Sequence, residues 1–431
     1  MAAGLITFKK QIPFHAAAGG QVQVMQIELP KPPYPGPLRV LSDFSGSLAV
    51  NALIAFIFAA SAPVAILLAT GARGGLSEAE LASWIFGAFF VNGIISIVFC
   101  ILYRQPLVFF WTIPGTVLVG PALDHLSFAE VIGAFYATGV LLFVLGQSGW
   151  VRRTMTALPM PIVMAMVAGI FLRFAFDWLG ALQSGFWIAG PMTLVFFGLT
   201  AYPPLARRLP PLISTLAVGL IAIWLAGGYA PGAQLTLQIA APVIFAPAWS
   251  LAAMFELVLP LAITVLAAQN AQGFAILAAR GHAAPVNAVT AACGIGALLG
   301  AVVGTVSTCL TGPVNAIISS TGAKERHYTA GIAIGVLAIV FGLFSPAFTK
   351  FMLATPPAFI ATLAGVALLG VLQSAFRTAF TGRFSFGALI TFLVTVADIP
   401  MLGIGAAFWA LVFGFAASWL LERGDFKQAE D

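Results

Sequence analysis

Twelve long apolar runs, spread along almost the whole chain, constrain its fold more than any other feature. They lie near residues 46–70, 79–103, 129–148, 157–177, 186–203, 211–228, 253–279, 286–303, 328–345, 355–374, 384–397 and 403–421. A straight helix needs roughly 20 apolar residues to cross a bilayer, and most of these runs approach that length. Only 8% of the residues are charged, which is far below the charged fraction of an ordinary soluble domain. The runs predict an all-α polytopic membrane protein and exclude a soluble enzyme, a nucleic-acid-binding module and a disordered chain.

Two further segments, 106–123 and 306–320, are apolar but too short and too interrupted to be ordinary spans. In each of them an adjacent Pro and Gly follow a Thr. The first reads Thr112-Ile113-Pro114-Gly115, and the second reads Thr311-Gly312-Pro313. Proline is tolerated in the first turn of a helix, and a preceding Thr can cap that turn. Each segment is therefore predicted to be a short strand followed by a half-helix that begins near the middle of the membrane.

Sequence landmarks recur at a nearly constant offset. Thr112 and Thr308 are 196 residues apart, and Pro159 and Pro356 are 197 residues apart. Interrupted segments at corresponding places in two halves are typical of transporters built from inverted repeats. We expect four parts in the chain: an N-terminal tail, a first repeat, a second repeat and a C-terminal tail, at residues 1–39, 40–230, 231–423 and 424–431.

The basic residues predict the orientation of the chain. If both interrupted segments cross the membrane, sixteen of the nineteen Lys and Arg residues lie on one side. The other three, Arg73, Arg173 and Lys350, lie on the opposite side. Because basic residues concentrate on the cytoplasmic side of membrane proteins, we expect both termini in the cytoplasm. The count predicts about fourteen crossings of the cytoplasmic membrane, arranged as seven plus seven inverted segments.

The two half-helices are the first candidate for a binding site. A helix that begins inside the membrane presents unpaired N–H groups and a positive dipole end, and a bound anion can satisfy both. The residues that would border such a pocket come from the two interrupted segments: Trp111, Thr112, Ile113, Pro114, Gly115, Thr311, Gly312, Pro313 and Asn315. The alternative is that these Pro and Gly residues only kink packed helices, which is common in membranes.

Three carboxamides interrupt the run at 253–279. Gln269 and Gln272 share one helical face, and Asn270 lies about 100° around the helix. Polar groups inside a membrane are costly and face a neighbour or a cavity, so all three are predicted to bind substrate or, alternatively, to bond a neighbouring helix. Ser61 on the first span could reach the same pocket, or it could bond back to its own helix.

Glu256 is the one acidic residue placed well inside a long apolar run, and it is the candidate for carrying a coupled proton. The alternative is that it faces interfacial water near the end of its span. The sequence has no CxxC or HExxH spacing and no nucleophile–base pair within the spans. We therefore expect no metal, no cofactor, no nucleic-acid partner and no enzymatic activity.

The stretch at 268–274, followed by the stretch at 308–313, resembles the benzoate:proton symporter family (BenE) over roughly residues 40–423. That family is similar in fold to bacterial uracil permease and to the wider nucleobase and anion transporters. The resemblance implies a core domain that moves against a gate domain in an elevator-like way. Members of the family often form homodimers. Substrate would lie between the third and tenth segments and against the eighth, which here carries Gln269, Asn270 and Gln272.

The sequence departs from the nucleobase permeases of this fold at one important place. Those proteins carry acidic residues on the eighth and tenth segments, facing the substrate, whereas this chain has amides and Thr, Gly and Pro. Amides suit an anion, which a carboxylate would repel. The sequence therefore predicts import of benzoate or a similar aromatic carboxylate with protons, with Trp111 over the ring. A carrier of another organic or inorganic anion or of a nucleobase, or a passive anion channel, are the alternatives.

Overall fold

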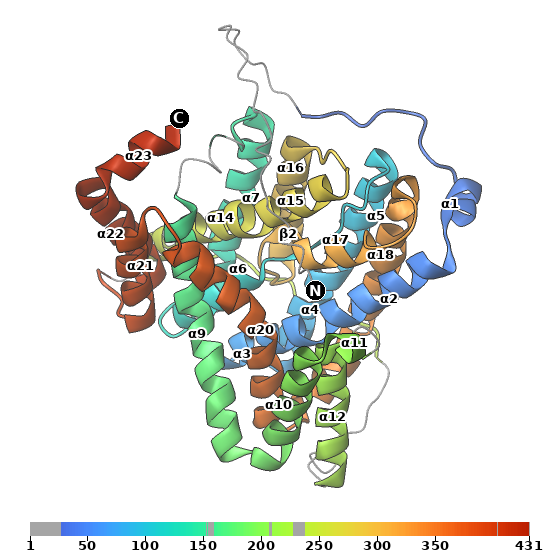
Figure 1. Ribbon diagram of the computed structural model, residues 1–431, viewed down its shortest axis with the longest axis horizontal. Coiled ribbons are helices and arrows are strands. Elements are labelled where there is room, and N and C mark those ends of the chain that lie inside the picture. The colour runs from blue at the N-terminus through green and yellow to red at the C-terminus, as the bar shows by residue number, and fades with distance from the viewer. Residues whose placement is uncertain are drawn as a thin grey trace, which may run out of the picture.

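The computed structural model describes residues 27–151, 153, 159–206, 209–226, 238–402 and 404–430, and these are mostly helical (Figure 1). The elements up to residue 225 are α1 (Pro37–Asp43), α2 (Gly46–Ala60), α3 (Ala62–Arg73), α4 (Glu78–Phe86), η1 (Gly87–Val91), α5 (Asn92–Tyr103), β1 (Phe109–Trp111), α6 (Ile113–Ala122), α7 (Phe128–Ser148), α9 (Met160–Ser184), α10 (Phe186–Ala201), α11 (Pro203–Ala206) and α12 (Pro211–Leu225).

The later elements begin with one long span made of α13 (Leu251–Ala253), η2 (Met254–Val258), α14 (Leu259–Ile263), η3 (Thr264–Asn270) and α15 (Ala271–Ala279). They continue with α16 (Val286–Val302), β2 (Thr308–Leu310), α17 (Gly312–Ile318), η4 (Lys324–Arg326), α18 (His327–Leu343), α19 (Ser345–Leu353), α20 (Pro357–Phe380), α21 (Ser385–Ala397), α22 (Ala406–Leu421) and α23 (Arg423–Glu430).

The predicted fold class is confirmed. Among the described residues, seven continuous helical stretches are long and apolar enough to cross a membrane, and six shorter apolar helices accompany them. The short strand and half-helix β2–α17 completes a series that matches the fourteen segments expected from the sequence. The proposed boundary between residues 230 and 231 and the tail at 1–26 lie outside the described residues, so the division into repeats stays a prediction.

Both interrupted segments contain the strand and half-helix that the sequence predicted. β1 pairs with β2 in antiparallel register, with Phe110 opposite Cys309 and Trp111 opposite Thr308. The helices that follow begin at Ile113 and Gly312, each with a proline in its first turn. Structurally equivalent positions are 199 residues apart, since Thr112 and Thr311 precede the two helices. The offset of 196 taken from Thr112 and Thr308 is therefore wrong by three residues, because Thr308 opens a strand rather than preceding a helix.

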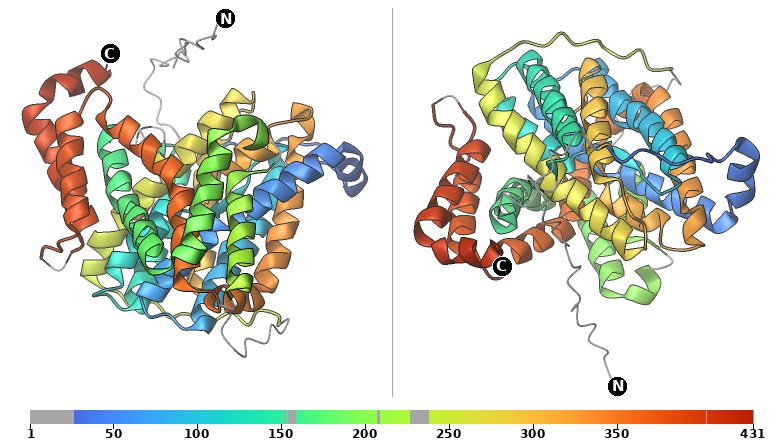
Figure 2. Two further views of the ribbon diagram at one scale, coloured as in Figure 1. Left: turned by 60° about the horizontal axis from the view of Figure 1, so that its bottom comes forward. Right: turned by 90° about the horizontal axis from the view of Figure 1, so that it is seen from above.

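The helices pack into two groups around this strand pair. One group, which we call the α9 bundle, consists of α9, α10, α12, α20, α21 and α22. The other, the strand bundle, consists of α2 to α7 and α14 to α18 with β1 and β2 at its centre. Figures 1 and 2 show α21 and α22, in red, at the edge of the molecule opposite α1 and α2, in blue. Contacts of α3 with α20, and of α6 and η3 with α9, join the two bundles.

The long span from Leu251 to Ala279 departs from a regular helix at two places. Its turns at Met254–Val258 and Thr264–Asn270 are π-helical, with one extra residue in the hydrogen-bonded ring. Such wide turns rotate the residues after them and are frequent at functional sites. Here the second wide turn ends at the carboxamides, where Gln269 and Asn270 are its last residues.

Candidate functional site

A cavity of about 400 Å³ lies where the two half-helices begin, between the strand bundle and the α9 bundle. We call it the amide cavity, because Gln269 and Gln272 form part of its wall. Aromatic side chains of Phe58, Phe110 and Phe171 form much of the rest. None of the described residues that line it is charged. The cavity is therefore a neutral, largely apolar chamber with a few polar groups, as is usual for small-molecule sites.

Seven of the residues predicted from sequence line this cavity. They are Trp111, Ile113, Pro114, Gln269, Gln272, Thr311 and Pro313. They come from both half-helices and from the span that crosses beside them, so residues more than 150 positions apart meet at one chamber. The other predicted residues do not line this cavity: Ser61, Thr112, Gly115, Glu256, Asn270, Gly312 and Asn315.

Gln269 and Gln272 present free carboxamides. Gln272 is exposed and Gln269 is half-buried, and neither side chain has a hydrogen-bond partner among the described residues. The Gln272 side chain lies directly over Gly312, where an added Cβ would be 2.7 Å from its Oε1 atom and 2.8 Å from its Cδ atom. Two amides with unused donors and acceptors are therefore available to a ligand in the cavity.

Asn270 points the other way and supports the strand pair. Its Oδ1 atom accepts a hydrogen bond of 2.8 Å from the backbone N–H of Leu310, and its Nδ2 atom donates to the Cys293 thiol at 3.5 Å. Its side chain is fully buried. This geometry corresponds to the structural alternative for Asn270, whose amide satisfies a neighbouring segment.

Asn315 has a similar structural geometry. Its side chain accepts from the backbone N–H of Val108 and donates to the carbonyl of the same residue, each at 3.1 Å, and it also donates to the carbonyl of Thr311. A buried carboxamide that completes a broken backbone in this way replaces the ladder hydrogen bonds that so short a strand lacks. Asn315 thereby joins α17 to the residue that precedes β1.

Thr112 and Thr311 precede the two half-helices but use their hydroxyls differently. The Thr112 hydroxyl accepts from the N–H of Gly115 at 3.1 Å and donates to the hydroxyl of Thr264 at 3.2 Å, so it caps α6. The Thr311 side chain does not cap α17, and it has no hydrogen-bond partner among the described residues. The first turn of α17 is consequently the less satisfied of the two helix starts beside the amide cavity.

Ser61 lies at the break between α2 and α3 and is buried. Its hydroxyl donates to the carbonyl of Phe58 at 3.1 Å, which is the back-bonded alternative considered from the sequence. The residues around it, Ala59, Ala62 and Pro63, do line the amide cavity. The serine therefore shapes the wall by breaking the helix, and its hydroxyl is already used.

Glu256 belongs to a second cavity. This cavity of about 510 Å³, which we call the charged cavity, is lined by apolar residues together with Arg73, Arg173, Asp177, Glu256 and Asp398. Glu256 is 4% exposed, and its carboxylate lies 2.9 Å from Nε2 of His125. The structure therefore places Glu256 on a different cavity from the free amides.

Sequence reasoning missed several residues of the amide cavity. Phe58, Met160, Met164 and Phe171 are ordinary apolar residues within apolar runs, and nothing in their pattern distinguishes them. Ser374 and Thr378 of α20 also line the cavity. They are hydroxyl residues one turn apart in a largely apolar helix, and that spacing was a usable signal.

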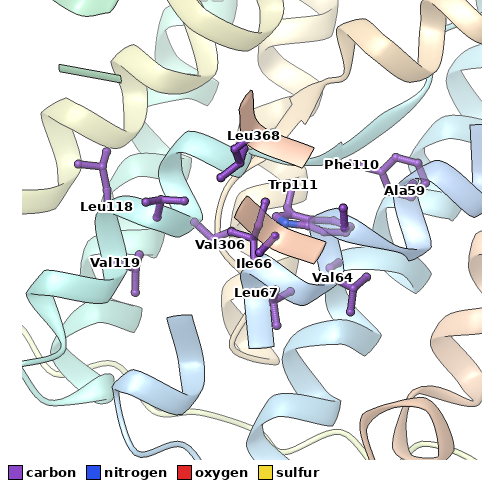
Figure 3. Packing of buried hydrophobic residues seen from close by; sticks show 14 of the residues in the cluster. Ala59, Val64, Ile66, Leu67, Phe110, Trp111, Leu118, Val119, Val306 and Leu368 are labelled. Carbon is purple, nitrogen blue, oxygen red and sulfur yellow. The ribbon is translucent and has the colours of Figure 1, made fainter. Parts of the chain in front are cut away.

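Trp111 lines the cavity and also packs against the hydrophobic core. Its ring lies 5.1 Å from that of Phe89 between centroids, and its side chain is only 3% exposed. Figure 3 shows the indole surrounded by Ile66, Val64 and Phe110. The indole nitrogen has no hydrogen-bond partner among the described residues. An unpaired buried donor is uncommon, and it leaves one polar group beside an otherwise apolar wall.

Comparison with known proteins places this site in a family. Residues 42–420 match the family model described as benzoate membrane transport protein, which covers most of the chain. The chain belongs to this family of membrane transporters. A curated relative from Acinetobacter baylyi, named benzoate membrane transport protein, is 28% identical over 386 residues, which cover 88% of this chain and 96% of that protein. The inner membrane protein YdcO of Escherichia coli K12 is 29% identical over 365 residues, covering 84% and 92% respectively.

Solved structures show the same fold at low sequence identity. The transmembrane domain of a cyanobacterial bicarbonate transporter, BicA, superposes with a TM-score of 0.58 at 16% identity, covering 89% of this chain and 99% of that one. SLC26A9 superposes with a TM-score of 0.60 at 13% identity, covering 89% of this chain and 67% of that one. These similarities show a transporter fold shared with anion carriers. The resemblance stated from two sequence motifs is therefore confirmed at the level of family and fold.

Proposed function

We propose that this protein imports benzoate, or a similar aromatic carboxylate, together with protons. The observation that carries the proposal is the amide cavity, which combines an uncharged, aromatic wall with two carboxamides that have no partner among the described residues. An aromatic acid has the matching shape, because it offers one planar apolar ring and one group that accepts hydrogen bonds. The family assignment supports the same substrate class.

In this proposal the carboxylate lies at the α17 side of the cavity. Gln269, Gln272 and the hydroxyl of Thr311 donate to it, and hydrogen bonds to an ionised acceptor are stronger than neutral ones. Leaving a carboxylate unpaired in a neutral cavity would be costly, so several donors are needed. Trp111, Phe110 and Phe58 cover the ring. Among the residues that the structure describes, no carboxylate lines the cavity, which disfavours a nucleobase, whose N–H groups need acceptors.

Glu256 is the proposed proton carrier, with His125 as its hydrogen-bonded partner. The alternative is that the substrate enters with its own proton as the neutral acid. Both termini are proposed to be cytoplasmic. In that orientation, the ends of α9 and α20 that line the amide cavity lie on the cytoplasmic side, and the charged cavity lies on the outer side. Movement of a core against a gate, and a homodimer, remain expectations from the family resemblance.

The direct test is uptake of labelled benzoate into proteoliposomes under an imposed pH gradient. We expect accumulation that is driven by a lower outside pH and that collapses with a protonophore. Competition by unlabelled aromatic acids, bicarbonate and uracil identifies the substrate class, and only the aromatic acids should compete. Passive flux without saturation would support a channel instead.

Glu256→Gln separates the two proton routes in the same vesicles. If Glu256 carries the proton, the variant still exchanges internal for external benzoate but no longer accumulates it against a gradient. Accumulation at the wild-type level would leave the neutral acid as the route.

A further inference from the structure

The two cavities lie in series along the same helices. On α3, Ile66 lines the amide cavity, whereas Ala69 and Arg73 line the charged cavity. On α9 the order is the same, with Met164 on the first and Asp177 on the second. No described residue lines both cavities. They are therefore two separate chambers at successive depths rather than one channel.

A packed apolar layer separates the two chambers. Figure 3 shows Trp111 and Ile66 on one part of this layer and Leu118 on another, with Leu67 and Val306 among them. Leu67 and Val306 are fully buried. Protein interiors are close-packed, so buried apolar side chains such as these leave little room for water or for a carboxylate to pass. A substrate can cross only if this layer rearranges.

Asp398 connects the two bundles beside the charged cavity. Its carboxylate forms an ion pair with Arg173 of α9, in its own bundle, and lies 3.9 Å from Nη2 of Arg73, at the end of α3 in the strand bundle. Asp398 directly follows α21 and has a φ angle of +51°, in the left-handed region that L residues rarely adopt. Besides the helix packing between the bundles, the strand bundle thus contacts the α9 bundle through the Asp398 carboxylate, which also pairs with Arg173.

Arg73 has a second acidic partner within its own bundle. Its guanidinium makes a two-pronged contact with Asp124, which follows α6, and the Nε bond measures 3.0 Å. This pair lies within one bundle and does not join the two. The amide cavity differs, because none of the described residues in its lining is charged. The Asp398–Arg73 contact between the bundles therefore lies at the charged cavity, whose lining includes both residues.

We propose that Asp398 is the latch of an outer gate: its contact with Arg73 holds the two bundles together over the charged cavity while the amide cavity is open to the cytoplasm. Each transport cycle breaks the Asp398–Arg73 contact to open the outer side and forms it again to close it. The inner and outer labels rest on the orientation given under the proposed function, whereas the latch itself does not depend on the substrate.

Cysteine accessibility in the full-length protein, measured without substrate, tests the latch. Ala69→Cys, one turn before Arg73, reports on the charged cavity, and Ser374→Cys reports on the amide cavity. The three native cysteines are fully buried, so their background reaction with a membrane-impermeant cationic thiosulfonate is low. The reagent is added to intact cells for Ala69→Cys and to inside-out vesicles for Ser374→Cys.

Adding Asp398→Asn should raise the modification rate of Ala69→Cys at least threefold and lower that of Ser374→Cys. Arg73→Gln removes the other partner and should act in the same direction, which provides a second route to the result if one variant misfolds. Asp124→Asn is the matched control, because it removes a carboxylate from Arg73 within one bundle, and it should change neither rate.

Unchanged rates in Asp398→Asn and Arg73→Gln would overturn the latch, and so would an equal effect of Asp124→Asn. Reaction of Ala69→Cys only from the cytoplasmic side would overturn its outer position. Because no step of this measurement uses benzoate, a protein that fails to transport benzoate can still show the latch, and the two failures are distinguishable.

Discussion

The two half-helices α6 and α17 begin at equivalent places on one strand pair, yet their N-terminal ends are capped differently. The ten-residue α6 is capped by Thr112, whose hydroxyl is used twice. The seven-residue α17 has no side-chain cap, and the free amide of Gln272 lies over its first residue. A closed helix start needs no ligand, whereas an open one beside a cavity can take one. The difference supports the part of the proposed function that puts the carboxylate on the α17 side of the amide cavity, with α6 as a supporting helix.

The largest expected effect comes from closing the α17 side. In Gly312→Ala the new methyl would lie 2.7 Å from Oε1 of Gln272, so the amide must leave its position. The displaced amide and the new methyl would together block the α17 side of the cavity, so we expect benzoate affinity to fall about 100-fold, or about 2.8 kcal/mol, measured by uptake kinetics in proteoliposomes. Gly198→Ala is the control, since its Cβ would meet nothing within 4 Å. Wild-type affinity in Gly312→Ala would contradict the assignment.

Asn270→Leu tests whether the amide beside Gln269 is structural. The substitution leaves the buried N–H of Leu310 without its acceptor, and we expect the free energy of unfolding to fall by about 2 kcal/mol. Thermal unfolding in detergent measures this loss. The matched variant Gln269→Leu removes an unpartnered amide and should keep the stability of the wild type while weakening benzoate binding. Equal stability of the two variants would refute the distinction.

Gln272→Leu isolates the contribution of one donor at the open helix start. The amide has no partner among the described residues, so its loss should leave folding intact. Loss of one hydrogen bond to a charged acceptor should reduce benzoate affinity about tenfold, or about 1.4 kcal/mol. Gln272→Asn, which shortens the side chain but keeps the amide, should recover part of that affinity. A variant that loses stability instead would indicate a structural amide.

The smallest effects come from the paired substitutions Thr112→Val and Thr311→Val. Thr112→Val removes the cap of α6, and we expect a loss of about 1 kcal/mol in unfolding free energy with nearly unchanged binding. Thr311→Val removes a hydroxyl that caps nothing, and we expect unchanged stability with affinity reduced several-fold. If both variants lose stability alike, the two helix starts are equivalent and the contrast fails.

The sequence predicted the spans, both interrupted segments and the group of residues around the site, because apolar run length and the position of Pro and Thr act locally. It could not separate Gln272 from Asn270. Both are amides in an apolar helix. The rotation of the wide turn and the position of Leu310, forty residues after Asn270, decide which of them faces the cavity and which bonds the strand. Phe58 and Phe171 were missed for the same reason, since contacts between distant helices define a cavity wall.

The pairing of β1 with β2 also has a consequence for biosynthesis. Phe109 to Trp111 find their strand partners in Thr308 to Leu310, which the ribosome adds about 200 residues later. Until then, three residues of extended chain at membrane depth lack their ladder partners, which lipid cannot replace. Nascent chains that stop before residue 308 should therefore stay open to proteolysis near β1, and chains that pass α17 should become resistant. The amide cavity is therefore expected to be among the last parts of the molecule to form.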